Sequence, residues 1–381
     1  MKFNTKTIHG NQHHDPSTGA VMMPIYQTST FVQSSPGVHK GYEYSRGANP
    51  TRSALENALA SIENGTHGFA FGSGLAATDS VMKMLNPGDE IIAMDDLYGG
   101  SYRMFTRIYQ KYGLKFHFTD MTDPENVKAL INENTKLIWI ETPTNPLMKI
   151  ADIQAICDLV KGQAILVAVD NTFASPYLQN PLDLGADIVM HSATKYLGGH
   201  SDVVAGALVV KSEELAEKVH FQLFAGGGIL GPQDSYLVLR GIKTLHVRMQ
   251  RHCENGKAVV DFLVNHPKIG QVFHPGLPSH PNHEVAKKQM RDFGGMVSFN
   301  FKSGKGEDAV KFLESVRVFT LAESLGGVES LANHPTTMTH ASIPADVRLA
   351  NGITDDLVRL SVGIEDIDDL LADLEQALAK V

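Results

Sequence analysis

Residues 187–201, DIVMHSATKYLGGHS, combine residue types that could bind a phosphate and place an amine beside it. The apolar run 188–190 is typical of a buried strand, and it leads into the hydroxyl groups of Ser192 and Thr194 and the amine of Lys195. A pyridoxal 5'-phosphate (PLP) site requires these groups, because the amine forms a Schiff base and the hydroxyls bind the phosphate. An isolated S-x-T-K turn is more often a surface lysine at a strand end, so the rest of the chain decides between the two readings.

Two further predicted strands end in residues that suit the same site. A glycine turn at 72–77, after residues 68–71, opens a helix whose free backbone N–H groups suit a phosphate, although such turns are also common packing devices. Asp170 ends the apolar run 164–169, and an unpaired buried carboxylate would be costly there. It therefore needs a cationic or donor partner, which a protonated pyridine nitrogen would provide. Ligands of open α/β sheets bind outside the carboxyl ends of the strands, so these groups should converge.

The elements that must position these residues are short apolar runs alternating with amphipathic stretches. Seven runs are predicted to be strands, at 68–71, 90–94, 115–118, 137–141, 164–170, 187–191 and 205–210. Helical patterns lie between them, for example at 150–160, and strands joined by helices imply crossover connections. We therefore predict an α/β protein with a mainly parallel seven-stranded sheet covered on both faces.

The pattern changes in the last third of the chain. One long helix is predicted at about 234–264, and Asp366 is expected to cap the last helix. The later predicted elements are strands at 296–301 and 357–363 and helices at 308–316 and 366–381. We expect three parts: an extended N-terminal arm (1–44), a large domain (45–243) and a smaller C-terminal α/β domain (244–381).

Composition and charge exclude several classes of function. The 381 residues are 43% hydrophobic and 20% charged, as in an ordinary globular protein. A net charge of −9 gives no general attraction to nucleic acid or to an anionic membrane. The first fourteen residues lack the apolar stretch of a signal peptide, and the longest apolar run, 164–169, is too short to span a bilayer. We expect a cytoplasmic protein with neither nucleic acid nor membrane as a partner.

The cysteines and histidines do not predict a metal site. Only Cys157 and Cys253 occur, and Cys157 shares an apolar helical face with Ile153 and Ile156, as a core residue would. A disulfide framework is therefore excluded. The 17 histidines form neither an HExxH motif nor a CxxC-with-histidine pattern, so no metal ligands are expected.

Residues 187–201 closely resemble the PLP-lysine signature of the Cys/Met metabolism family of PLP-dependent enzymes, which carry out trans-sulfuration. Further motifs follow in the family's order: EYSRGANPTR (43–52), FGSGLAA (71–77), ETPTNP (141–146), VDNTFASP (169–176), ESLGGVES (323–330) and SVGIED (361–366). The resemblance covers nearly the whole chain. It implies PLP as the cofactor and PLP fold type I, the fold of aspartate aminotransferase.

The same resemblance implies which residues hold the cofactor. Lys195 would form the Schiff base and then move protons between Cα, C4′ and Cβ, as the central catalytic residue. Asp170 would pair with the pyridine nitrogen, and Tyr98 would stack on the ring. The phosphate would be bound by the backbone of Gly74 and Leu75, by the hydroxyl groups of Ser192 and Thr194, and by Tyr44 and Arg46 of a neighbouring subunit.

Substrate binding and assembly also follow from the resemblance. Arg359, with Ser324 and Asn145, would hold the substrate α-carboxylate, a task that suits the planar fork of a guanidinium group. Since Tyr44 and Arg46 would cross to a neighbour, the active sites should form in dimers, and we expect a homotetramer built as a dimer of dimers. An alternative is that these two are merely surface residues of the arm.

A few positions bear on the reaction within the family. Glu323 stands where γ-acting members have a glutamate, and Glu43 and Arg103 match polar positions that those members direct at the distal end of the substrate. Gly100 stands where methionine γ-lyases have a reactive cysteine, which argues against that activity. The expected activity is that of a cystathionine γ-lyase, which converts L-cystathionine to L-cysteine, 2-oxobutanoate and ammonia.

Several alternatives stay open at this point. The runner-up reaction is the γ-synthase one, which joins an O-acylhomoserine to cysteine, and β-elimination of cystathionine comes third. Glu43 and Arg103 could instead form a mutual surface ion pair. A nucleotide-binding oxidoreductase is disfavoured, because residues 71–77 lack the third-glycine spacing of G-x-G-x-x-G. A regulatory binding module would not need Lys195.

Overall fold

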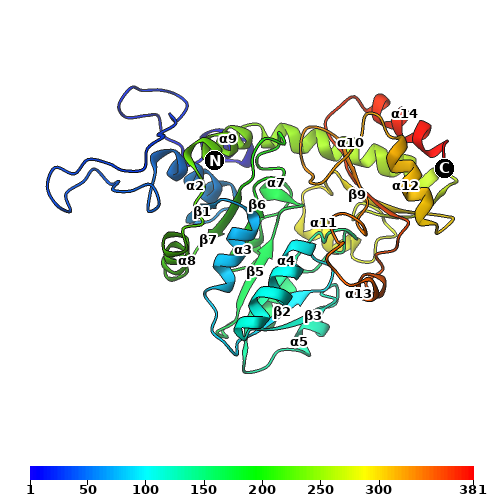
Figure 1. Ribbon diagram of the computed structural model, residues 1–381, viewed down its shortest axis with the longest axis horizontal. Coiled ribbons are helices and arrows are strands. Elements are labelled where there is room, and N and C mark those ends of the chain that lie inside the picture. The colour runs from blue at the N-terminus through cyan, green and yellow to red at the C-terminus, as the bar shows by residue number, and fades with distance from the viewer.

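Two β-sheets organise the computed structural model, which describes residues 1–381 (Figure 1). The larger sheet has seven strands in the spatial order β1-β7-β6-β5-β4-β2-β3. The strands are β1 (His67–Phe71), β2 (Glu90–Met94), β3 (Lys115–Thr119), β4 (Thr135–Glu141), β5 (Leu166–Asp170), β6 (Ile188–Ser192) and β7 (Gly206–Val210). Only β7 is antiparallel to its neighbours, β1 and β6. The predicted seven strands and the mainly parallel sheet are therefore confirmed.

Helices cover both faces of this sheet, because its strands are apolar on both sides. Alternate strand residues contribute to different hydrophobic clusters, so that Leu208 packs on the side of α3 and α8 and Val209 on the side of α2 and α9. The helices of this part are α2 (Pro50–Ile62), α3 (Gly74–Met82), α4 (Gly99–Met104), α5 (Pro124–Lys128), α6 (Ile153–Leu159), α7 (Ser175–Leu178), α8 (Glu213–Gly226) and α9 (Pro232–Ile242). Cys157 is a core residue of α6, as predicted.

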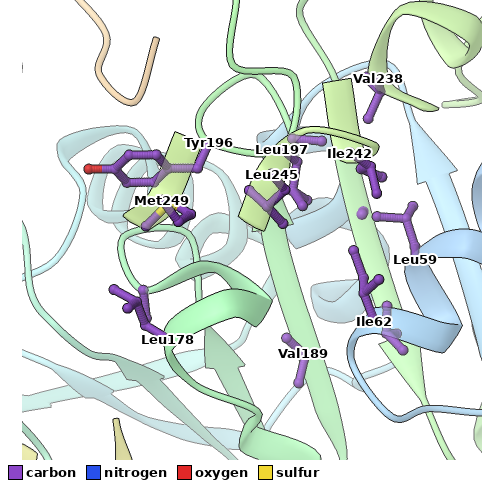
Figure 2. Close-up of a cluster of buried hydrophobic side chains, with 14 of the residues drawn as sticks. Leu59, Ile62, Leu178, Val189, Tyr196, Leu197, Val238, Ile242, Leu245 and Met249 are labelled. Carbon is purple, nitrogen blue, oxygen red and sulfur yellow. The ribbon is translucent and has the colours of Figure 1, made fainter. Parts of the chain in front are cut away.

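One hydrophobic cluster anchors the chain directly after Lys195. Figure 2 shows Tyr196 and Leu197 among buried side chains that include Leu245 and Met249. Tyr196 and Leu197 are each only 1% exposed. Because buried side chains in a well-packed core hold one conformation, this packing fixes where the lysine side chain begins.

The smaller sheet lies in the C-terminal third and has the order β10-β11-β12-β9-β8. Its strands are β8 (Ile269–Phe273), β9 (Met296–Phe301), β10 (Thr320–Leu321), β11 (Leu331–Asn333) and β12 (Leu357–Ser361). The accompanying helices are α10 (Leu245–Asn265), α11 (His283–Gln289), α12 (Gly306–Ser315), α13 (Ala345–Ala350) and α14 (Ile367–Leu378). Asp366 caps α14 by accepting a hydrogen bond from the Asp368 N–H at 3.1 Å, as predicted. The short strands β8, β10 and β11 were not predicted.

The single long helix predicted at 234–264 is wrong, since the chain turns between α9 and α10. The Gly241 carbonyl accepts the Thr244 N–H and the Thr244 hydroxyl, which closes a tighter turn than an α-helix allows. A Cβ at Gly241 would lie 2.2 Å from the Gly198 carbonyl oxygen, so close packing also requires glycine there. The proposed domain boundary at 243/244 falls in this turn, and α10 then runs across to the smaller sheet (Figure 1).

The N-terminal segment is extended only in part. Helix α1 (Phe3–His9) packs against α2 and α10, and Thr7 is fully buried, with its Oγ1 3.1 Å from His246 Nδ1. The expectation of an extended arm over all of 1–44 is therefore wrong for α1. Beyond it, the blue segment loops away from the body in Figure 1, and Val32 and Val38 are 92% and 55% exposed.

No helix is both long enough and apolar enough to cross a membrane.

Candidate active site

A cavity of about 400 Å³ opens at the carboxyl ends of β4, β5 and β6. Most of the predicted site residues line it, namely Gly74, Leu75, Tyr98, Asn145, Asp170, Ser192, Thr194, Lys195, Glu323, Ser324 and Arg359. They come from both sheets and from segments far apart in the sequence. The strand order places three predicted strand ends side by side, so the convergence expected from the sequence occurs.

Lys195 lies in the turn after β6, and its Nζ donates a hydrogen bond to Ser324 Oγ at 2.6 Å. Burial, with the nearby charge of Arg359, lowers the pKa of this amine to about 8, against an opposing effect of Glu323. The neutral amine is the nucleophilic form, so Lys195 is more readily available for Schiff-base chemistry than a surface lysine.

A phosphate would fit beside this amine, at the start of α3. Ser73 caps the helix by accepting the Ala76 N–H at 3.0 Å, and the next two residues, Gly74 and Leu75, begin it with N–H groups that have no partner within the helix. A Cβ at Gly74 would lie 3.0 Å from Ser192 Cβ, so glycine lets the helix approach β6 closely. Ser192 and Thr194 line the same cavity, and the Thr194 hydroxyl also donates to the Ala205 carbonyl at 3.2 Å. Sequence reasoning had not included Ser73.

Asp170 faces the cavity from the end of β5 and is 7% exposed. Its Oδ1 accepts the Thr172 N–H at 3.0 Å, but no lysine or arginine forms an ion pair with it. Burial raises the pKa of this carboxyl above its usual value. A pyridinium N–H would supply the missing partner, so the amine, the phosphate donors and this carboxyl together fit PLP.

Arg359 on β12 is buried and donates hydrogen bonds to two other residues predicted to bind the substrate. Its Nη1 donates to Asn145 Oδ1 at 2.8 Å and its Nη2 to the Ser324 carbonyl at 3.0 Å, whereas its Nε has no partner. Burial lowers the pKa of this guanidinium to about 10. Ser324 has a φ of +92°, an unfavourable backbone conformation for a residue with a Cβ. The arrangement suits a carboxylate ligand.

Tyr98 lies next to Glu141, which was not among the predicted site residues. Tyr98 precedes α4 and is 39% exposed at the cavity. Its backbone N–H donates to Oε2 of Glu141 at 3.0 Å. Glu141 is the last residue of β4 and lines the cavity. The sequence carried the same signal here as for Asp170, a carboxylate that ends an apolar strand.

Four predicted site residues do not line the cavity of their own chain. Arg46 Nη1 donates to the Phe224 carbonyl at 2.9 Å, and its guanidinium lies 5.5 Å from the ring centre of Tyr44. Glu43 pairs with His39 at 2.8 Å. Arg103 is exposed on α4, with Ser342 Oγ at 3.5 Å from its Nη1. The mutual ion pair considered for Glu43 and Arg103 is therefore not formed.

The remaining reactive side chains do not gather into a second centre. No group of three or more His, Cys, Asp and Glu residues is arranged to hold a metal ion. Both cysteines are buried, and burial raises the pKa of each thiol to about 12.

Comparison with known proteins gives consistent results. The family model described as Cys/Met metabolism PLP-dependent enzyme matches residues 4–379. The chain is 54% identical to cystathionine β-lyase from Coxiella burnetii over 378 residues, 99% of this chain and 97% of the relative. It is 54% identical to cystathionine γ-synthase from Mycobacterium bovis over 376 residues, 98% and 96% of the two chains. The crystal structure of cystathionine γ-lyase from Lactobacillus plantarum complexed with L-serine matches with a TM-score of 0.97 and 48% identity, covering 100% and 99%.

Proposed function

Because the chain belongs to the Cys/Met metabolism family of PLP-dependent enzymes, we propose that it is a cystathionine γ-lyase. The protein is a PLP-dependent enzyme of sulfur amino-acid metabolism with carbon–sulfur lyase activity. The proposed reaction is α,γ-elimination, in which L-cystathionine and water give L-cysteine, 2-oxobutanoate and ammonia. Relatives named for three activities match the chain at similar identity, so the choice among them depends on the residues of the cavity.

The cofactor would be held by the groups described above. PLP, when bound, supplies an electron sink for the bonds at the substrate α-carbon. We assign the phosphate to the start of α3 and to the hydroxyl groups of Ser192 and Thr194, the pyridine nitrogen to Asp170 and ring stacking to Tyr98. Lys195 Nζ, held by Ser324 Oγ, would take the proton from substrate Cα, release it, and then take a proton from Cβ.

Glu323 is the observation that supports a γ-acting enzyme with cystathionine as its substrate. It is an exposed carboxylate that lines the same cavity as Lys195, next in sequence to the Ser324 turn. With the α-carboxylate on Arg359 and Asn145, a long substrate would extend toward solvent. There Glu323 could pair with the distal ammonium of cystathionine, which O-acylhomoserines lack. Glu43 of a neighbouring arm and Arg103 would complete the distal region.

The activity is tested by assaying the purified, PLP-loaded protein with two substrate sets. We expect 2-oxobutanoate and cysteine from cystathionine, at a higher kcat/KM than cystathionine formation from O-succinylhomoserine plus cysteine. Faster γ-replacement would identify a γ-synthase instead. Pyruvate and homocysteine as the main products from cystathionine would identify a β-lyase.

Glu323→Ala is expected to raise KM for cystathionine by about tenfold and to lower kcat much less, because a lost ion pair to the distal ammonium weakens ground and transition states alike. γ-Elimination of O-succinylhomoserine, which has no distal amine, should change much less. Steady-state kinetics on both substrates measure the difference. Glu329→Ala is a matched control, since Glu329 lies in the same loop and bonds Ser201 Oγ at 2.9 Å. Equal losses on both substrates would mean that Glu323 supports the loop only.

We further propose a homotetramer in which Tyr44 and Arg46 contact the phosphate of a neighbouring subunit. Neither residue reaches the cavity of its own chain. Tyr44 pairs with Thr30 in an isolated bridge that closes the loop 31–43, which contains the exposed Val32 and Val38, and Arg46 follows two residues later. The exposed apolar side chains of this loop would be covered by a partner chain.

Arg46→Ala is expected to weaken PLP retention, because a charge-assisted phosphate contact is lost. Mixed oligomers of Arg46→Ala and Lys195→Ala subunits should regain activity, since one hybrid site carries neither substitution. Activity after co-refolding, with mixed oligomers verified by two affinity tags, measures this. Mixing Arg46→Ala with Tyr44→Ala is the control, because every hybrid site then keeps one substitution. No recovery in the first mixture would show that each subunit completes its own site.

A further inference from the structure

Two carboxyl groups, at the ends of neighbouring strands, line the cavity side by side. Glu141 ends β4, Asp170 ends β5, and the parallel register pairs these two residues directly. They are 4% and 7% exposed, and both line the cavity. Two carboxylates this close in a dry environment cannot both ionise without a large cost, so one of them should keep a proton.

The surroundings of Glu141 decide which one. The charged groups that interact with it are Asp170, Asp96 and Arg359. Arg359 is the only cation among them, and its Nη atoms bond Asn145 and Ser324 instead. Burial, the neighbouring Asp170 and Asp96 raise the pKa of the Glu141 carboxyl well above its usual value. Asp170, by contrast, faces the place assigned to a pyridinium cation.

One hydrogen bond connects Glu141 to the site residue Tyr98. Its Oε2 accepts the backbone N–H of Tyr98 at 3.0 Å. Tyr98 is assigned to ring stacking, and Asp170, the register partner of Glu141 on β5, is assigned to the pyridine nitrogen. One buried side chain thus adjoins two parts of the proposed cofactor site.

We propose that Glu141 is a positioning residue that works in its neutral, protonated form: it holds Tyr98 in place and leaves Asp170 as the single carboxylate opposite the pyridine nitrogen. The inference rests on the roles proposed for Tyr98 and Asp170 and not on which sulfur substrate the enzyme uses.

Glu141→Gln separates the neutral form from the charged one, because glutamine keeps the shape and an acceptor oxygen without a charge. In the PLP-loaded protein we expect the infrared band of a protonated carboxylic acid to disappear, while PLP affinity and kcat/KM stay within about threefold of wild type. Glu141→Leu keeps the volume but leaves the backbone N–H of Tyr98 without its acceptor. It should lower kcat and PLP affinity by about tenfold or more.

The proposal is overturned if Glu141→Gln leaves that infrared band in place, or if it lowers PLP affinity and kcat as much as Glu141→Leu does. Either result would mean that the carboxylate charge matters. PLP affinity, from titration of the apoprotein, and the infrared band do not depend on the substrate. A protein that fails to turn over cystathionine but shows both expected results would therefore contradict the γ-lyase assignment alone. Circular dichroism confirms that each variant is folded.

Discussion

Lys195→Ala is expected to lower turnover by about 10⁴-fold or more, because the substitution removes both the Schiff-base nucleophile and the group that moves protons at the substrate. The protein should stay folded, since the neighbouring Tyr196 and Leu197 keep their packing in the core. The near-visible absorbance of the purified protein should shift, as PLP can no longer bond to a protein amine. Steady-state kinetics and absorbance spectra together measure the result.

Lys211→Ala is the matched control for this experiment. Lys211 follows β7, bonds Asp183 at 3.0 Å and lies outside the cavity. It should therefore leave the spectrum and the rate unchanged. A Lys195→Ala protein that retained the wild-type spectrum, or more than about a tenth of the rate, would show that another amine holds the cofactor.

Asp170→Asn has the second-largest expected effect. An amide cannot stabilise a pyridinium as a carboxylate does, so the electron sink weakens while the shape of the side chain is conserved. If the ion pair contributes about 3 kcal/mol in the transition state, kcat falls by about a hundredfold. The measurement is kcat at saturating PLP, with PLP affinity determined separately by titration.

Asp183→Asn controls for loss of a carboxylate elsewhere in the large domain, since Asp183 is a surface partner of Lys211. The fold should tolerate Asp170→Asn, because the hydrogen bond from the Thr172 N–H can be accepted by the amide oxygen. A change in kcat of less than about threefold would mean that Asp170 is not the partner of the pyridine nitrogen.

Local sequence was sufficient for the strands of the larger sheet, for the glycine turn at 72–77, for Asp170 and for the turn that holds Lys195, whereas the other predicted cavity residues were inferred from the family resemblance. Apart from the edge strand β3 (Lys115–Thr119), which alternates polar and aromatic residues, each predicted strand of the larger sheet is an apolar run, as expected of a strand buried on both faces. In a parallel sheet such strands end at one edge. The residues that follow them, such as Gly74, Asp170 and Lys195, therefore meet without any further information about tertiary structure.

Three features depended on tertiary contacts. At the end of α9, Gly241 packs on the Gly198 carbonyl and its own carbonyl closes the turn to Thr244, and helical periodicity carries no record of these contacts. Glu141 resembles Asp170 in its sequence context, since both are carboxylates that end an apolar strand. Its proposed role, however, depends on the strand register, which places the two carboxyl groups on adjacent strands. Composition and periodicity likewise did not indicate that Tyr44 and Arg46 lie outside the cavity of their own chain.

Local patterns of polarity set where strands end and helices start. The sequence by itself therefore predicts that an amine, the free N–H groups of a helix start and a carboxyl group converge. Only the tertiary structure decides the charge states around them. Burial and neighbouring charges shift the pKa of Lys195 to about 8 and raise that of Glu141. Such pKa shifts depend on distances between side chains that are remote in sequence. These distances are defined only in the folded chain, so local sequence patterns cannot predict the shifts.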